Sequence, residues 1–233
     1  MSVKVVEAPG RGVWRVGRSP DPLALNDPLS PSELDQPFTG NRFDSPTGAY
    51  RVLYFATKLE ACYGETLARF RPDTALAALL ADEWAGRGWM NLGDVPAAWR
   101  QRRIAVNVRF VPAGRFGHGV KFLNVEALET RELLKVELGE LLAYWGHHDL
   151  DVATVRGGDR RVTRLIGQWA YDQADEAGLP LYAGVRYLSR LSSDWECWAV
   201  FEDVELQEVS RQSVLATDVA LQRVARKYGL TVY

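Results

Sequence analysis

The feature that most constrains the fold is a stretch in which a loop framed by Gly40 and Gly48 leads into a short apolar strand and then a helix. Residues 52–56, Val-Leu-Tyr-Phe-Ala, form an apolar and aromatic run whose length and bounds are typical of a buried β-strand. Thr57 offers a hydroxyl as the N-cap of the helix, and Glu60 stands three positions later as a capping-box partner. The stretch therefore predicts a buried strand with a helix directly after it.

Glu65 occupies an unusual position on that helix. It lies between an apolar stripe that includes Leu59 and Leu67 and a small-residue face that includes Gly64. A carboxylate in this position can point into a cleft, and small neighbours let another backbone or a ligand approach closely. The alternative is an ordinary surface pair with Arg69 four positions later, which would contribute only ~0.3–0.5 kcal/mol.

Further strands and helices follow from the periodicity of apolar residues. The clearest strand covers residues 103–111, where Ile104, Val106, Val108 and Phe110 alternate with other side chains. Other strands are predicted at residues 13–16, 120–125, 149–155, 181–188 and 195–201, and helices at 72–84, 126–145, 160–177 and 213–228. Residues 86–96 and the proline-rich residues 19–37 are predicted to be loops. The second of these would form either a flap over a site or a surface excursion.

Composition bounds the class of protein. A chain of 233 residues with 47% hydrophobic residues can bury a sizeable core, and we expect a single domain over residues 1–233. No apolar run is long enough for a membrane span, and the N-terminus lacks the apolar segment of a signal peptide, so we expect a cytoplasmic protein without a membrane partner. The formal net charge of -2 gives no reason to expect direct nucleic-acid binding.

Arginines cluster locally despite this overall balance. The groups are Arg11, Arg15 and Arg18; Arg42 and Arg51; and Arg156, Arg160, Arg161 and Arg164. For any single arginine a solvated surface position is the better interpretation. Several together could bind an anionic small molecule, because the planar guanidinium binds phosphate oxygens in pairs.

Three familiar kinds of site are disfavoured. His147 and His148 are adjacent, so their side chains diverge, and no third ligand is suitably spaced; no metal site is expected. Gly157-Gly158 lacks the Lys and Ser/Thr of a P-loop, and no GxGxxG occurs. The sequence contains no Gly-x-Ser-x-Gly elbow, so a serine hydrolase is disfavoured. Cys62 and Cys197 lie in apolar runs, which is typical of buried thiols.

Four residues in their local contexts resemble the signature of the RES-domain family. They are Arg42 in Gly-Asn-Arg-Phe, Tyr54 in Val-Leu-Tyr-Phe-Ala, Glu65 in Ala-Cys-Tyr-Gly-Glu and Ser189 in Val-Arg-Tyr-Leu-Ser-Arg. The resemblance covers residues 14–201, with 202–233 as a C-terminal helical extension. It implies an α+β fold similar to that of ADP-ribosyltransferases, with a central mixed, largely antiparallel β-sheet flanked by helices. It also implies an enzyme that consumes NAD, and many members are toxins of bacterial toxin–antitoxin pairs.

The resemblance assigns a role to each of these residues. Glu65 would stabilise the positive charge that grows on the ribose when nicotinamide leaves. Arg42, with Arg15 from the opening strand in support, would hold phosphate oxygens. Tyr54 would stack on a ring or bind a ribose hydroxyl, and Ser189 would bind the substrate or orient the acceptor. The expected NAD-binding set is Arg15, Asn41, Arg42, Tyr54, Ser189 and Arg190, and Arg190 or Arg186 would help to hold an incoming anion.

The acceptor of the ADP-ribosyl group stays open at this level. Phosphate as co-substrate or water would make the protein an NAD phosphorylase or glycohydrolase, which the arginines favour slightly, whereas a protein side chain would make it an ADP-ribosyltransferase. A non-catalytic ligand-binding module is a further alternative, although such a module would be expected to have lost some of the four signature residues. An antitoxin protein that occludes the site and a homo-oligomer are possible partners.

Overall fold

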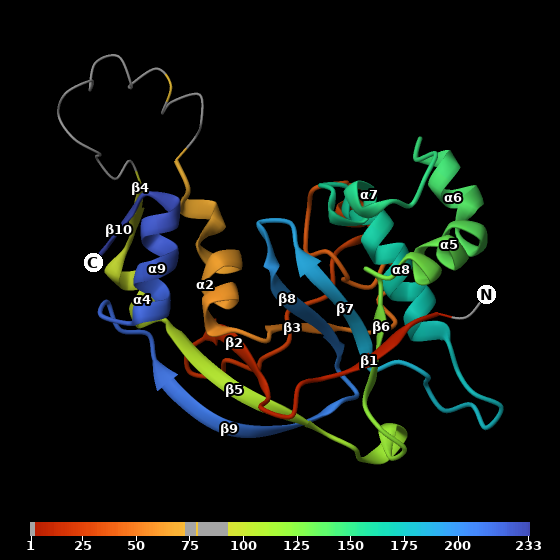
Figure 1. Ribbon diagram of the computed structural model, residues 1–233, viewed down its shortest axis with the longest axis horizontal. Helices are drawn as coiled ribbons and strands as arrows, with labels where there is room; N and C mark the ends of the chain where they lie inside the picture. The colour runs from red at the N-terminus through yellow and green to blue at the C-terminus, as the bar shows by residue number, and fades with distance from the viewer. Residues whose placement is uncertain (1–2, 73–77, 79–92) are drawn as a thin grey trace.

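The computed structural model describes residues 3–72, 78 and 93–233. Its strands form one large sheet and one small sheet (Figure 1). The strands of the large sheet are β1 (Val5–Glu7), β2 (Val13–Arg18), β3 (Val52–Ala56), β5 (Arg103–Val111), β6 (Lys121–Asn124), β7 (Gly184–Ser189), β8 (Ser192–Phe201) and β9 (Glu205–Ser213). The small sheet pairs β4 (Gly93–Val95) with β10 (Leu230–Val232) in parallel.

The large sheet has eight strands in the order β1-β6-β7-β8-β3-β2-β5-β9. Its pairs are antiparallel except for β6 with β7, so the predicted mixed, largely antiparallel α+β fold is confirmed. One junction in the sheet is weak. Strand β2 meets β3 through the single pair Trp14–Ala56, whereas its six residues all pair with β5. Strands β2 and β3 therefore diverge, and backbone groups of β3 are left without strand partners there.

The helices gather in two groups (Figure 1). One group contains α2 (Leu59–Leu67), which continues into the short 3-10 turn η1 (Ala68–Phe70), together with α4 (Ala97–Gln101) and α9 (Val219–Tyr228). The other contains α5 (Leu128–Glu137), α6 (Gly139–Tyr144), α7 (Val152–Arg156) and α8 (Arg160–Asp172). The remaining short elements are α1 (Pro31–Leu34) and the 3-10 turn η2 (Gly114–Phe116).

Alternation along β3 shows how the sheet divides the apolar core. Val52 and Ala56 belong to the larger buried cluster, which includes residues of α2, α8 and α9. Leu53 and Phe55 belong to a smaller cluster built from strands, loops and η2. Because successive side chains of a strand point to opposite faces, both helix groups cover the same face of the sheet.

Several predicted elements are confirmed. The strand at residues 103–111 is β5 with identical bounds, and the run at 52–56 is β3. The strands predicted at 13–16, 120–125, 181–188 and 195–201 correspond to β2, β6, β7 and β8. The helix predicted at 72–84 and most of the loop at 86–96 lie outside the described residues.

Other expectations are wrong for local reasons. Residues 152–156 form helix α7 instead of a strand, because the Asp151 side chain caps the backbone N–H of Thr154. Thr57 does not cap α2; its hydroxyl donates to Glu196 and accepts from the Trp198 indole, and Lys58 takes the N-cap position. The helix predicted over 126–145 is divided at Leu138 into α5 and α6.

The helical extension predicted over residues 202–233 is helical only in α9, because residues 205–213 form strand β9, which was not predicted, and residues 230–232 form β10. Eight of the nine residues of β9 are exposed, so it lacks the alternation on which strand prediction depends. It pairs along β5 at the edge of the sheet. Within the described residues, none of the helices has the length and apolar character needed to cross a bilayer.

Candidate active site

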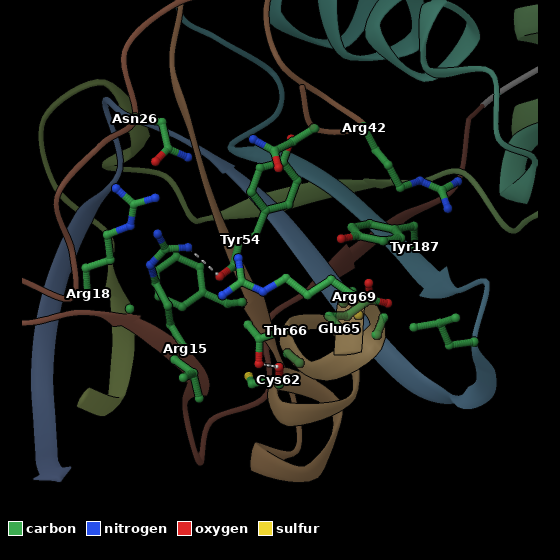
Figure 2. A pocket seen from close by; sticks show the side chains of 18 of the residues that line it. Arg15, Arg18, Asn26, Arg42, Tyr54, Cys62, Glu65, Thr66, Arg69 and Tyr187 are labelled. Carbon is green, nitrogen blue, oxygen red and sulfur yellow. Dashed lines mark hydrogen bonds between the residues drawn. The ribbon is translucent and has the colours of Figure 1, made fainter. Parts of the chain in front are cut away.

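A cavity of about 720 Å³ opens on the helix-covered face of the sheet (Figure 2). Its walls come from β2, β3, α2 and β7, from the turn between α7 and α8, and from residues 21–27 and 41–42 of the long loop before β3. It lies beside the divergence of β2 and β3. Its size is within the range of sites that hold small molecules and cofactors.

Glu65 and Ser189, which are 124 positions apart in the sequence, meet at this cavity. The Ser189 hydroxyl donates to Glu65 Oε1 at 2.5 Å and accepts a hydrogen bond from the backbone N–H of Leu191 at 3.0 Å. Ser189 is only 1% exposed, whereas Glu65 lines the cavity and is exposed within it. A bonded hydroxyl thus fixes one carboxylate oxygen, and no described residue donates to the other.

A close contact between α2 and β8 sets the position of this carboxylate. A Cβ placed on Gly64 would come within 2.1 Å of the Trp195 ring, so only glycine permits this approach. The small-residue face of the helix therefore does admit a neighbour, as expected from the sequence, and here the neighbour is the Trp195 ring. The Tyr228 hydroxyl of α9 also donates to the Gly64 carbonyl at 3.2 Å.

Tyr54 lines the cavity with its ring, while its hydroxyl is engaged in the protein. That hydroxyl accepts from the backbone N–H of Phe43 at 2.9 Å and donates to Asp44 at 3.2 Å. Burial raises the pKa of Tyr54 well above its ordinary value, and the charge of Asp44 raises it further. The geometry suits ring contact with a ligand and leaves the hydroxyl to hold the loop.

Arg42 and Asn41 come from the same loop. The Arg42 guanidinium donates to the Val155 carbonyl of α7 and lies 5.4 Å from the centre of the Tyr187 ring. Its Nε is buried and has no hydrogen-bond partner among the described residues. Both the backbone N–H and the side-chain amide of Asn41 donate to Asp44. These contacts fix the loop at the edge of the cavity, opposite Arg15 and Arg18 (Figure 2).

Arg15 fills the divergence between β2 and β3. Its guanidinium donates to the Tyr54 carbonyl at 3.1 Å and to the Pro22 carbonyl at 2.8 Å. It thereby gives a carbonyl of β3 a hydrogen-bond donor and fixes the proline-rich loop. Gly17 allows the loop to lie this close to β2, because a Cβ at this position would lie 2.1 Å from the Pro22 oxygen. Residues 24–27 of this loop line the cavity, so the loop is part of the site and not a mere surface excursion.

The cavity is strongly cationic. Among the described residues, its lining contains seven arginines, namely Arg15, Arg18, Arg42, Arg69, Arg103, Arg160 and Arg190, and three carboxylates, Asp21, Asp27 and Glu65. The net charge of the whole chain is -2, so positive charge is concentrated here. Burial lowers the pKa of Arg160, and the charge of Arg190 lowers it further, which indicates that the two guanidiniums lie near each other. The arrangement suits an anionic ligand with more than one phosphate.

Other arginines that the sequence suggested lie elsewhere. Arg186 pairs with Glu196 at 2.8 Å and is absent from the cavity lining, so it does not face an incoming anion. Arg156 pairs with Glu126, and Arg161 pairs with Asp159. Arg164 is 1% exposed and donates to the carbonyls of Leu34 and Thr39. Of that last sequence cluster, only Arg160 reaches the cavity.

Some lining residues were missed by sequence reasoning as site residues. Tyr187 lies beside Arg42 and two positions before Ser189, and this spacing was the one available signal. Arg18, Arg69 and Arg103 were not identified as one group, because only the pairing of β2 with β5 brings two of them together. Thr66 lines the cavity and donates to the Cys62 carbonyl at 2.8 Å.

Neither metal nor thiol chemistry is indicated by the described residues. No group of His, Cys, Asp and Glu among them could hold a metal ion. Burial raises the pKa of the Cys62 thiol to about 12, and the thiol donates to the Trp14 carbonyl. Cys62 therefore remains a neutral packing residue at neutral pH.

Comparison with known proteins gives one finding. The family model described as the RES domain matches residues 12–222, which is most of the chain and contains every residue that lines the cavity. No curated protein and no solved structure matches the chain.

Proposed function

The chain belongs to the RES-domain family, and on that premise we propose that it cleaves the bond between nicotinamide and ribose in NAD. The observation that carries the proposal is the Glu65–Ser189 pair, a carboxylate fixed by a buried hydroxyl within a cavity lined by seven arginines. A dinucleotide offers what such a cavity requires, namely a pyrophosphate for guanidiniums and a sugar for the carboxylate.

The chemistry of the bond explains why so few groups are needed. Nicotinamide in NAD is cationic and leaves as a neutral molecule, so the leaving group needs no general acid. The ribose that remains develops oxocarbenium character, as sugars do in glycoside hydrolysis. A carboxylate held beside the sugar stabilises this charge, and fixed electrostatic groups of this kind contribute strongly to catalysis. Glu65 is the carboxylate that we assign to this role.

Ser189 acts through Glu65 in this proposal, because it is buried and is not among the residues that line the cavity. Its hydroxyl donates a hydrogen bond to Glu65 Oε1 and accepts one from the Leu191 N–H, so the hydroxyl has a single orientation. The free oxygen of Glu65 is then available to the ribose, where it can accept a hydrogen bond from a hydroxyl. Ser189 is accordingly a positioning residue for the carboxylate.

Aromatic rings and arginines would hold the remainder of the substrate. The rings of Tyr54 and Tyr187 line the cavity and offer apolar faces to a planar base. Arg42, Arg160 and Arg190 lie at the side of the cavity formed by the α7–α8 turn and β7, and we assign the pyrophosphate to them. Arg15 and Asn41 support the site by fixing loops through their hydrogen bonds.

Incubation with NAD tests this function directly. Purified full-length protein is expected to release nicotinamide, measured by chromatography, and the second product is identified by mass. ADP-ribose 1″-phosphate in phosphate buffer would identify phosphorolysis, ADP-ribose would identify hydrolysis, and ADP-ribose attached to protein would identify transfer to a side chain. If no nicotinamide appears with or without phosphate, the proposal is wrong.

A toxin role would follow from depletion of NAD in the cell. Expression of the chain alone is then expected to arrest growth, and co-expression of a neighbouring antitoxin gene is expected to relieve the arrest. The same arrest from a Glu65→Gln variant would show that growth arrest does not depend on the proposed chemistry.

A further inference from the structure

Two arginines stand directly opposite each other where β2 and β5 pair. The register aligns Arg18 with Arg103 as Cα partners. Side chains at opposed positions of an antiparallel pair have Cβ atoms about 4.5–5.5 Å apart, and like charges placed there are destabilising. No described carboxylate forms an ion pair with either residue, so the repulsion has no compensation in the described protein.

Arg69 adds a third positive charge from the other wall. It lies in η1, four positions after Glu65, and all three arginines line the cavity. Burial lowers the pKa of the Arg103 guanidinium, and the charges of Arg18 and then Arg69 lower it further. The Nε of Arg103 is buried and meets no hydrogen-bond partner in the described part of the chain, although the guanidinium lies 5.7 Å from the Trp99 ring.

These three arginines differ from Arg15, Arg42 and Arg160 in their contacts. Arg15, Arg42 and Arg160 each donate to a backbone carbonyl. The guanidiniums of Arg18, Arg69 and Arg103 donate no hydrogen bond to any described residue, so within the described part of the chain their N–H groups remain available to a ligand. Arg18 and Asn26 both line the cavity, and Figure 2 shows them on the side opposite Arg42 and Tyr187.

We infer that Arg18, Arg69 and Arg103 form a second anion subsite that binds a phosphate group, separate from the arginines assigned to the pyrophosphate. A dianionic phosphate placed among the three guanidiniums would attract each of them and so offset their mutual repulsion. Its oxygens match the planar forks of guanidinium groups, and the Asn26 amide can contribute one further donor. The inference extends the proposed function, because it concerns the same cavity.

Two sources could supply this phosphate group. Inorganic phosphate would act as the acceptor that attacks the ribose, and the position of Arg69 one helical turn from Glu65 brings the subsite close to the carboxylate. Alternatively, a dinucleotide with a 2′-phosphate on its adenosine ribose would place that phosphate in the subsite. The two sources share their chemistry and differ in which ligand binds.

Calorimetric titration of the full-length protein with inorganic phosphate, without NAD and at constant ionic strength, tests the first source. The wild type is expected to bind phosphate, and the double variant Arg18→Gln/Arg103→Gln is expected to bind it at least ~10-fold more weakly. Arg69→Gln, an exposed change in η1, provides a second variant whose folding is not in question. Arg109→Gln is the matched control, because Arg109 is exposed on β5 outside the cavity and its loss should leave Kd unchanged.

Titration with NADP and with NAD tests the second source. If inorganic phosphate does not bind, the subsite is supported only when NADP binds at least ~10-fold more tightly than NAD and the double variant loses that preference. The inference is overturned if neither phosphate binding nor an NADP preference occurs, or if the double variant and Arg69→Gln match the wild type in both. Absence of nicotinamide release would instead refute the proposed function, because the titrations do not depend on turnover.

Discussion

The two walls of the cavity are held in place by different means. On the wall of α2 and β7, regular elements position the polar groups, and the Glu65–Ser189 hydrogen bond joins one element to the other. On the opposite wall, loop residues 19–51 are fixed by arginines that donate to backbone carbonyls, as Arg15 does to Pro22 and Arg164 does to Leu34. Apolar packing thus determines where the carboxylate lies, whereas buried guanidiniums determine the shape of the loop wall.

Removing Arg164 should have the largest effect on stability. Arg164→Ala leaves the carbonyls of Leu34 and Thr39 without their donor and opens a space in the core. We expect the free energy of unfolding, measured by urea denaturation, to fall by about 3 kcal/mol. Arg161→Ala is the matched control on the same helix, since it removes a partly exposed ion pair with Asp159 and a contact with the Trp145 ring but leaves no backbone carbonyl without its donor; it should cost about 1 kcal/mol. Equal losses in the two variants would contradict the role of Arg164 as the fixing residue of the loop wall.

Gly64→Ala tests the helix wall in the same way. The added methyl group meets the Trp195 ring, so α2 must move away from β8 or the ring must shift. Overpacking of this kind should lower the free energy of unfolding by about 1–3 kcal/mol, and displacement of Glu65 should also lower the rate of nicotinamide release. Gly139→Ala in α6 has open space around it and should be neutral or stabilising. A Gly64→Ala variant as stable and active as the wild type would show that the close approach is not required.

The smallest effect is expected from Asp159, which caps the start of α8 next to Arg160. Burial alone would raise the pKa of Asp159, but hydrogen bonds with Arg161 and His147 lower it to about 2. Because the folded pKa lies below the unfolded value of about 3.9, this stabilisation is present above pH ~4 and is lost as the pH falls towards 2. The free energy of unfolding, measured between pH 7 and pH 2, should be lower for Asp159→Asn than for the wild type by less than ~1 kcal/mol, and only above pH ~4. A difference between the two proteins that persists unchanged at pH 2 would rule out this carboxylate as its source.

The sequence predicted the parts of the fold in which periodicity is strong. Apolar residues alternate with other side chains along the sequence of β5, and its bounds agree with the prediction, although residues 105–108 are all buried. Helix α7 was mistaken for a strand because its residues Val152 and Val155 favour strands, while a cap from Asp151 fixes the helix. Strand β9 is exposed at an edge of the sheet, so its sequence shows no alternation of apolar and polar residues from which a strand could be predicted.

The site was less accessible to prediction from the residues alone. Position on the helix left Glu65 undecided between a cleft and a surface pair, and Ser189 was distinguished from its neighbours only by resemblance to a family. The structure brings the two together through the pairing of β7 with β8 and the packing of α2. The opposition of Arg18 and Arg103 depends on strand register, and the burial of Arg164 depends on tertiary packing, neither of which a single sequence reveals.

The rate of nicotinamide release by Glu65→Gln is the most direct test of the central claim, that a fixed carboxylate stabilises the charge on the ribose. We expect the rate to fall by about 10²–10³ while the free energy of unfolding changes by less than ~1 kcal/mol. Glu60→Gln is the matched control, because Glu60 lies on the same helix outside the cavity, 4.0 Å from Arg223, and its loss should leave the rate unchanged. A Glu65→Gln variant that releases nicotinamide at the wild-type rate would contradict the account.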